Sequence, residues 1–196
     1  MFYALRNLFA LIGFCAVVLA IYGTVKVAPM IEAFDAFDER AIDVYTEMME
    51  KILETGNAAE ATVWKVKVNE DLSAADVEES MKFIANEHNI KNVGELPLSS
   101  QIEAMTGEKS RYLKIYMFCN ALTAAQMLEY SDSYSAYLPC RVSMVEDKEG
   151  ALWLYSLNMD AMIYGGTPLP AALKEEAEGV KEIILDIMNR GAEGDF

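Results

Sequence analysis

The chain has 196 residues, with 31 acidic against 16 basic side chains, and its formal net charge is -15. A surface of this sign repels nucleic-acid phosphates, so we exclude nucleic-acid binding. The chain has one histidine and three cysteines, and Cys15 lies in an apolar N-terminal stretch. The remaining three side chains are too few for a structural zinc site of four Cys or His ligands within one chain. We therefore expect no metal and no cofactor.

Residues 8–25 form an uncharged apolar run (LFALIGFCAVVLAIYGTV). A helix that crosses a bilayer usually needs about 20 such residues, so the run predicts a transmembrane segment within an anchor at 1–30, with the lipid bilayer as its partner. A cleaved signal peptide has a shorter apolar stretch and a small-x-small site, which this run lacks. A lipoprotein signal needs small residues just before its cysteine, but the bulky Phe14 precedes Cys15. A retained single-span anchor is favoured.

The flanking cations predict the orientation of this anchor. Arg6 and the terminal amine precede the apolar run, and Lys26 follows it. Because positive charge is favoured on the cytoplasmic side, we predict a cytoplasmic N-terminus. The following domain would then lie outside the cytoplasm, in the periplasm of a Gram-negative source.

Residues 31–55 predict one amphipathic helix, part of a stalk at 31–58. Its apolar positions recur every three or four residues, and Gly56 and Asn57 supply a stop. These positions are Phe34, Phe37, Ala41, Tyr45, Met48 and Ile52. The helix either packs on its own domain or pairs with a second copy of the chain through a short coiled-coil seam.

Residues 59–191 alternate between strand and helix patterns, and 192–196 form a frayed tail. The patterns predict a strand at 61–68, a helix from Ser73 to about 89 and a short strand at 90–96. A strand at 111–119 would bury Leu113, Ile115, Met117 and Cys119. A helix at 121–130, a hairpin around Gly150 and a last helix from Pro170 to Arg190 follow. This order predicts an antiparallel α+β domain.

From about residue 62 to 190 the chain resembles the domain-of-unknown-function 302 family. The resemblance rests on CNALTAAQMLEY (119–130), LPCRVSMVED (138–147) and MDAMIYGG (159–166), with support from 92–107. Ala121 stands where the family pattern has proline. The resemblance implies a small curved antiparallel sheet with packed helices, similar to the TATA-binding-protein architecture. It also implies dimers and an association with sulfur-oxidising bacteria, and it implies no activity.

Cys119 and Cys140 are the candidate thiol pair. Their strands alternate so that both lie on apolar faces, which favours two buried, inert thiols. A disulfide is the next alternative, because an extracytoplasmic domain permits one. The third is a reactive thiol, favoured only by the helix that begins directly after Cys119.

The neighbouring candidates have structural interpretations. Asn120 is expected to cap the following helix, Arg141 to form a surface ion pair, and His88 to be a hydrogen-bonded histidine at the core boundary. The twelve methionines are expected to fill gaps in the core, in preference to binding copper.

No catalytic motif is recognisable, so an enzyme is disfavoured. The first hypothesis is a membrane-tethered, non-catalytic binding or accessory module, working as a homodimer or in a membrane complex. The alternative is a thiol-based redox or sulfur-carrier protein that uses Cys119 and Cys140. A third hypothesis, binding of a small hydrophobic ligand, predicts a sizeable apolar cavity between sheet and helices.

Overall fold

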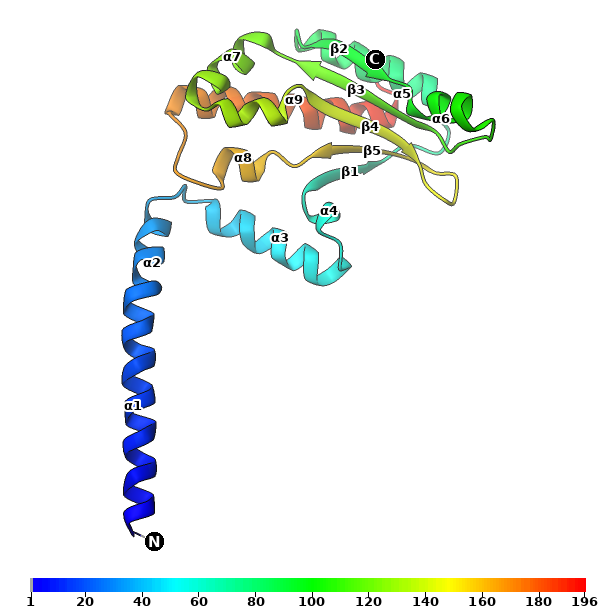
Figure 1. Cartoon of the computed structure of the whole chain (residues 1–196). Coiled ribbons are helices and arrows are strands. Elements are labelled where there is room, and N and C mark those ends of the chain that lie inside the picture. The colour runs from blue at the N-terminus through cyan, green and yellow to red at the C-terminus, as the bar shows by residue number, and fades with distance from the viewer. Residues whose placement is uncertain (1) are drawn as a thin grey trace.

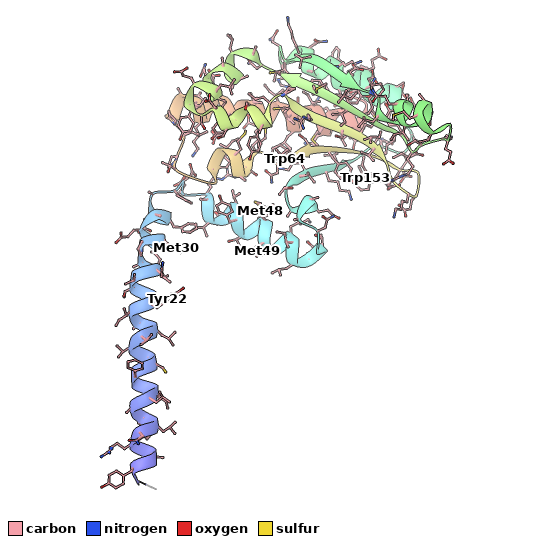
Figure 2. All side chains as sticks on the ribbon, viewed as in Figure 1. Tyr22, Met30, Met48, Met49, Trp64 and Trp153 are labelled. Carbon is pink, nitrogen blue, oxygen red and sulfur yellow. The ribbon has the colours of Figure 1, made fainter. Side chains whose placement is uncertain are left out.

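The computed structural model of the protein describes residues 2–196, and its N-terminal part is a single apolar rod. Helices α1 (Phe2–Lys26) and α2 (Ala28–Asp35) follow one another and extend away from the rest of the molecule (Figure 1). Leu5–Asp35 is long and apolar enough to cross a membrane, and none of its apolar stretch is buried. Tyr22 and Met30 project from this rod into open space (Figure 2).

The prediction of one helix over 31–55 is wrong, because the chain bends after α2 and begins α3 (Ala41–Thr55). Asp38 lies in this bend and is only 5% exposed. Its backbone N–H donates to the Gly166 carbonyl over 2.8 Å, and its carboxylate accepts a 2.5 Å hydrogen bond from the Lys174 ammonium. A buried carboxylate must be paired, and these partners, both distant in sequence, are reached only where the helix is interrupted. The stop at Gly56 is confirmed, with φ of 65°.

Helix α3 packs on its own domain. Val44 is buried, and the Tyr45 hydroxyl donates a 2.5 Å hydrogen bond to the Gly165 carbonyl, just after α8 (Asp160–Tyr164). The opposite side of α3 carries exposed apolar side chains, among them Met49 and Leu53.

The domain is built on one open antiparallel sheet of five strands in the order β1-β5-β4-β3-β2. The strands are β1 (Val63–Lys67), β2 (Lys91–Leu96), β3 (Leu113–Cys119), β4 (Cys140–Glu146) and β5 (Leu152–Leu157). The remaining helices are α4 (Ala58–Ala61), α5 (Ala74–Glu87), α6 (Leu98–Thr106), α7 (Ala121–Tyr130), the 3-10 helix η1 (Asp132–Tyr137) and α9 (Ala171–Glu193). The predicted antiparallel α+β class is confirmed.

Helices α5 and α9 lie side by side against one face of this sheet (Figure 1). Their inward side chains and those of the central strands form the main core. Its fully buried members include Val77, Met81, Ile84, Tyr116, Phe118, Val142, Met144, Leu154, Ile184, Ile187 and Met188.

The predicted buried face of β3 is wrong. Tyr116 and Phe118 are fully buried against the helices, whereas Leu113, Ile115 and Met117 are only half-buried on the other face. Both faces of this strand carry large side chains, so alternation alone does not say which face the helices cover. The Tyr116 hydroxyl is accommodated because it donates a 2.7 Å hydrogen bond to Glu78 of α5.

Local signals placed several element ends correctly. The Ser73 side chain accepts a hydrogen bond from the Asp76 N–H, and the Asp76 carboxylate accepts one from Ser73, so α5 begins with a capping box. The last helix, however, continues past Gly191 to Glu193 and ends at Gly194, with φ of 74°. Ala192 is fully buried, and Ser80 donates a hydrogen bond to the Asp195 carbonyl. These contacts hold residues 192–196 in place, whereas the sequence predicts a frayed tail there.

Candidate functional site

A pocket lies where β3 ends and β4 begins, between the sheet, α7, η1 and α9. The volume that it offers to atoms of the size of a water molecule is about 100 Å³, and the remaining space is open to solvent. The wall is mainly apolar, and Arg141 is the only charged side chain in it. We call it the α7 pocket and define it by the side chains that carry its chemistry: Cys119, Asn120, Met127, Cys140, Arg141, Met159 and Met162. An apolar cavity therefore lies between sheet and helices, but it is smaller than the sizeable cavity that the third hypothesis predicts.

Polar contacts hold α7 over the pocket. The Asn120 side chain accepts hydrogen bonds from the N–H groups of Leu122 and Thr123, at 3.1 and 3.4 Å, and so caps α7 as predicted. Further along α7, the Thr123 hydroxyl donates to the Glu176 carboxylate of α9 over 2.8 Å. These contacts hold the N-terminal part of α7 over the pocket.

The 3-10 helix η1 forms another wall of the pocket. The Tyr134 hydroxyl donates a 3.3 Å hydrogen bond to the carbonyl of Met162 in α8. Tyr134 and Tyr137, whose ring centroids are 6.5 Å apart, both line the pocket. The aromatic rings supply apolar surface, and their hydroxyls remain able to meet solvent or backbone.

Cys119 and Cys140 come together at the pocket. Cys140 is paired with Phe118 across β3 and β4, so Cys119 is one residue beyond the partner of Cys140. Strand geometry then puts the two Cα atoms roughly 6 Å apart, with side chains that start on opposite faces of the sheet. All three cysteines of the chain are free thiols in the structure. Cys119 and Cys140 are not joined because their side chains start on opposite faces of the sheet, whereas a disulfide needs side chains that point toward each other.

The thiols are poor nucleophiles in this environment. Burial raises the pKa of Cys140 to about 11, and the neighbouring Cys119 adds to the rise. Burial also raises the pKa of Cys119, despite the helix that begins directly after it. Both groups are therefore protonated at neutral pH, whereas reactive cysteines have a depressed pKa.

The other predicted site residues divide between two places. Asn120 and Arg141 line the α7 pocket with the two cysteines. His88 lies elsewhere, at the end of α5, where its Nε2 is 2.7 Å from the Asp186 carboxylate of α9. Arg141 is exposed, and within residues 2–196 it forms no ion pair, so the expected surface ion pair is wrong.

Three methionines that were not among the predicted site residues also line the pocket. Met127 comes from α7, and Met159 and Met162 come from the start of α8. The spacing Met159-x-x-Met162 is readable in the sequence, but the prediction that methionines fill gaps in the core gives these two no separate role. Met127 gave no signal, because its approach to α8 depends on how α7 folds over the sheet.

The family is decided by comparison with known domains. The family model described as "Domain of unknown function DUF302" matches residues 64–191, which is more than half of the chain. The chain belongs to the DUF302 family. The match includes all of the α7 pocket and begins after α4, so the N-terminal rod and α3 lie outside the DUF302 domain.

A solved DUF302 structure has a similar fold. It is the crystal structure of an uncharacterized conserved DUF302 protein from Bacillus stearothermophilus, with a TM-score of 0.54 and 16% sequence identity. The match covers 66% of this chain and 97% of that one. At this identity the likeness concerns the fold alone. No curated protein is similar enough to this chain to count as a match.

Proposed function

We propose that this protein is a membrane-tethered, non-catalytic binding module that holds a small ligand in the α7 pocket, outside the cytoplasm. The observation that carries the proposal is a concave, mainly apolar pocket with few polar groups, which is how small-molecule sites are usually built. The exposed apolar rod supports the tether, because about 20 apolar residues without burial in protein are stable in a bilayer.

The chemistry of the wall favours binding over catalysis. No histidine or carboxylate lines the pocket, so the described residues around it supply no general acid or base at neutral pH. The redox or sulfur-carrier alternative needs a thiolate, and the raised pKa values of Cys119 and Cys140 argue against one.

The tether is tested on the full chain in its membranes. We expect the protein to resist extraction by alkaline carbonate, and its domain to be digested by protease added from the periplasmic side. Release of a full-length or shortened chain by carbonate would contradict the tether. Protection of the domain until the membrane is permeabilised from the cytoplasmic side would reverse the orientation.

The pocket is tested with 4-fluorobenzenesulfonate, a small aromatic anion, followed by fluorine NMR on the full chain in lipid nanodiscs. We expect saturable binding that Ala124→Phe abolishes, because this side chain of α7 would fill the pocket, and that Arg141→Gln weakens. The matched control is Ala121→Phe, on the exposed side of the same helix. Binding that survives both pocket variants would refute the assignment of the site.

A further inference from the structure

Five sulfur-containing side chains line the α7 pocket, although they come from four separate segments. Cys119 ends β3, Cys140 begins β4, Met127 lies in α7, and Met159 and Met162 flank the start of α8. Met127 and Met159 are 4% and 7% exposed, and Cys140 and Met162 pack against the same apolar cluster. Side chains of β4, α7 and α8 that contain sulfur therefore line one pocket and belong to one apolar cluster.

The donor set selects the kind of metal that could bind. Thiolate and thioether sulfur are soft ligands, and they favour Cu(I) over magnesium, calcium or manganese, which require oxygen ligands. No carboxylate or histidine lines the pocket, and residues 2–196 contain no cluster of three or more His, Cys, Asp or Glu side chains suited to a metal. Zinc would need four nitrogen, thiolate or carboxylate ligands, and the pocket offers two thiols.

The charge of the pocket gives an independent reason. One thiolate and one Cu(I) ion cancel, so the complex that they form is neutral and suits an apolar wall, whereas a divalent cation would leave a buried net charge. The only charged side chain in the wall, Arg141, is exposed. Its guanidinium group is therefore hydrated and does not add a second positive charge to the buried part of the pocket.

We propose that the α7 pocket is a Cu(I) site in which the Cys140 sulfur and the thioethers of Met127, Met159 and Met162 hold the metal. On binding, the S–H bond of Cys140 breaks, a Cu–S bond forms, and the proton leaves to solvent; the oxidation state of the metal does not change. This inference rests on the proposed binding function, since it names the ligand of the same pocket.

The experiment is an anaerobic titration of the full chain in lipid nanodiscs with Cu(I), in competition with the chromophoric chelator bicinchoninate. We expect one Cu(I) per chain. Cys140→Ser should abolish this binding, and Met159→Leu or Met162→Leu should each weaken it by about tenfold or more. Leucine for methionine conserves volume, so the methionine variants are expected to remain folded even where a cysteine variant does not.

Matched controls are available within the chain. Cys15→Ser removes the thiol of the apolar rod, and Met105→Leu removes a thioether that is 87% exposed. Neither should change the stoichiometry or the affinity. X-ray absorption of the copper-loaded protein should show that only sulfur atoms are bonded to copper.

Three outcomes would overturn the inference: Cu(I) binding that persists in Cys140→Ser and in both methionine variants, binding that is lost in Cys15→Ser, or nitrogen and oxygen in the first shell. The arylsulfonate titration separates this failure from failure of the proposed function. If the sulfonate binds in the α7 pocket and Cu(I) does not, the metal assignment is wrong and the binding module stands. If neither binds, both are wrong.

Discussion

The two ends of the helical face of the sheet are built differently. At one end, α5 and the C-terminal half of α9 pack closely, and Met81, Ile84 and Ile187 are completely buried. At the other end, α7, η1 and the N-terminal half of α9 cover the same sheet and leave the α7 pocket, whose wall includes Ala177 and Val180 of α9. The same helix thus closes a core at one end and a binding pocket at the other.

The closed end and the wall of the pocket also differ in charge. The closed end carries a polar cluster of Glu78, Lys82, Glu95, Lys114 and Tyr116, in which the two lysines each pair with both carboxylates at 2.5 to 2.7 Å. The wall of the α7 pocket has one charged side chain, Arg141, which pairs with no carboxylate within the described residues. The polar cluster thus covers the closed end, whereas the wall of the pocket is formed mainly by apolar and sulfur-containing side chains.

The largest effect on the free energy of unfolding should come from creating a cavity in the core at the closed end. Ile84→Ala removes a fully buried side chain of α5 and should lower the free energy of unfolding by about 3 kcal/mol, because the tight core cannot collapse around the cavity. Met162→Ala, at the pocket wall, should cost about 1 kcal/mol, because the side chain already borders empty space. Urea unfolding of the full chain is followed by the fluorescence of Trp64 and Trp153, which both lie in the sheet (Figure 2). Equal losses would show that the two ends are packed alike.

The polar cluster should make the closed end sensitive to acid. Burial by itself would raise the pKa of Glu78, but hydrogen bonds from Lys114, Lys82 and Tyr116 outweigh it and lower this pKa from 4.5 to about 2. A carboxyl group with a depressed pKa stabilises the fold above its unfolded pKa. The contribution of Glu78, about 2 kcal/mol after allowance for solvent screening, is therefore present at neutral pH and lost as the pH falls from 4.5 to about 2.

The measurement is the difference in unfolding free energy between the unmodified protein and Glu78→Gln, taken from pH 7 downward. This difference should shrink as Glu78 becomes protonated. Glu54→Gln, which removes a surface pair with Lys51 whose members are 71% and 50% exposed, is the control and should change little at any pH. A Glu78 difference that stays constant with pH would contradict the role given to the polar cluster.

The smallest effects should come from two glycines of α9, one in each half of the helix. A Cβ on Gly191 would lie 2.6 Å from Met81 Cγ, so Gly191→Ala should destabilise the protein by about 1 kcal/mol or more. A Cβ on Gly179 meets nothing within 4 Å, so Gly179→Ala should stabilise it by about 0.5 to 1 kcal/mol through helix propensity. The same fluorescence assay gives both values. Changes of the same sign would mean that α9 is equally crowded along its length.

The sequence allowed good prediction of elements whose signals are local. The run at 8–25 falls within the apolar rod, residues 121–130 form α7 with Asn120 as its cap, and the hairpin around Gly150 joins β4 to β5. In each case the deciding interaction lies within a few residues of chain: a continuous apolar stretch, a side chain that accepts from the next turn, or a turn residue with positive φ.

Predictions that depended on distant partners were wrong. Asp38 interrupts the expected stalk helix because it binds Lys174, far along the chain. The prediction chose the wrong buried face of β3, because Tyr116 lies against the helices, where its hydroxyl donates a hydrogen bond to Glu78 of α5. Arg141 was expected to pair with a carboxylate, but the fold brings none to it within residues 2–196.

The sequence by itself determined the apolar helix, the antiparallel α+β class and the family, because each rests on a pattern that is continuous along the chain. Only the tertiary structure decided which face of the sheet is covered and which side chains meet at the α7 pocket. Cys119, Cys140, Met127, Met159 and Met162 become neighbours through strand pairing and through the position of α7 over α9, and these depend on contacts between residues far apart in sequence.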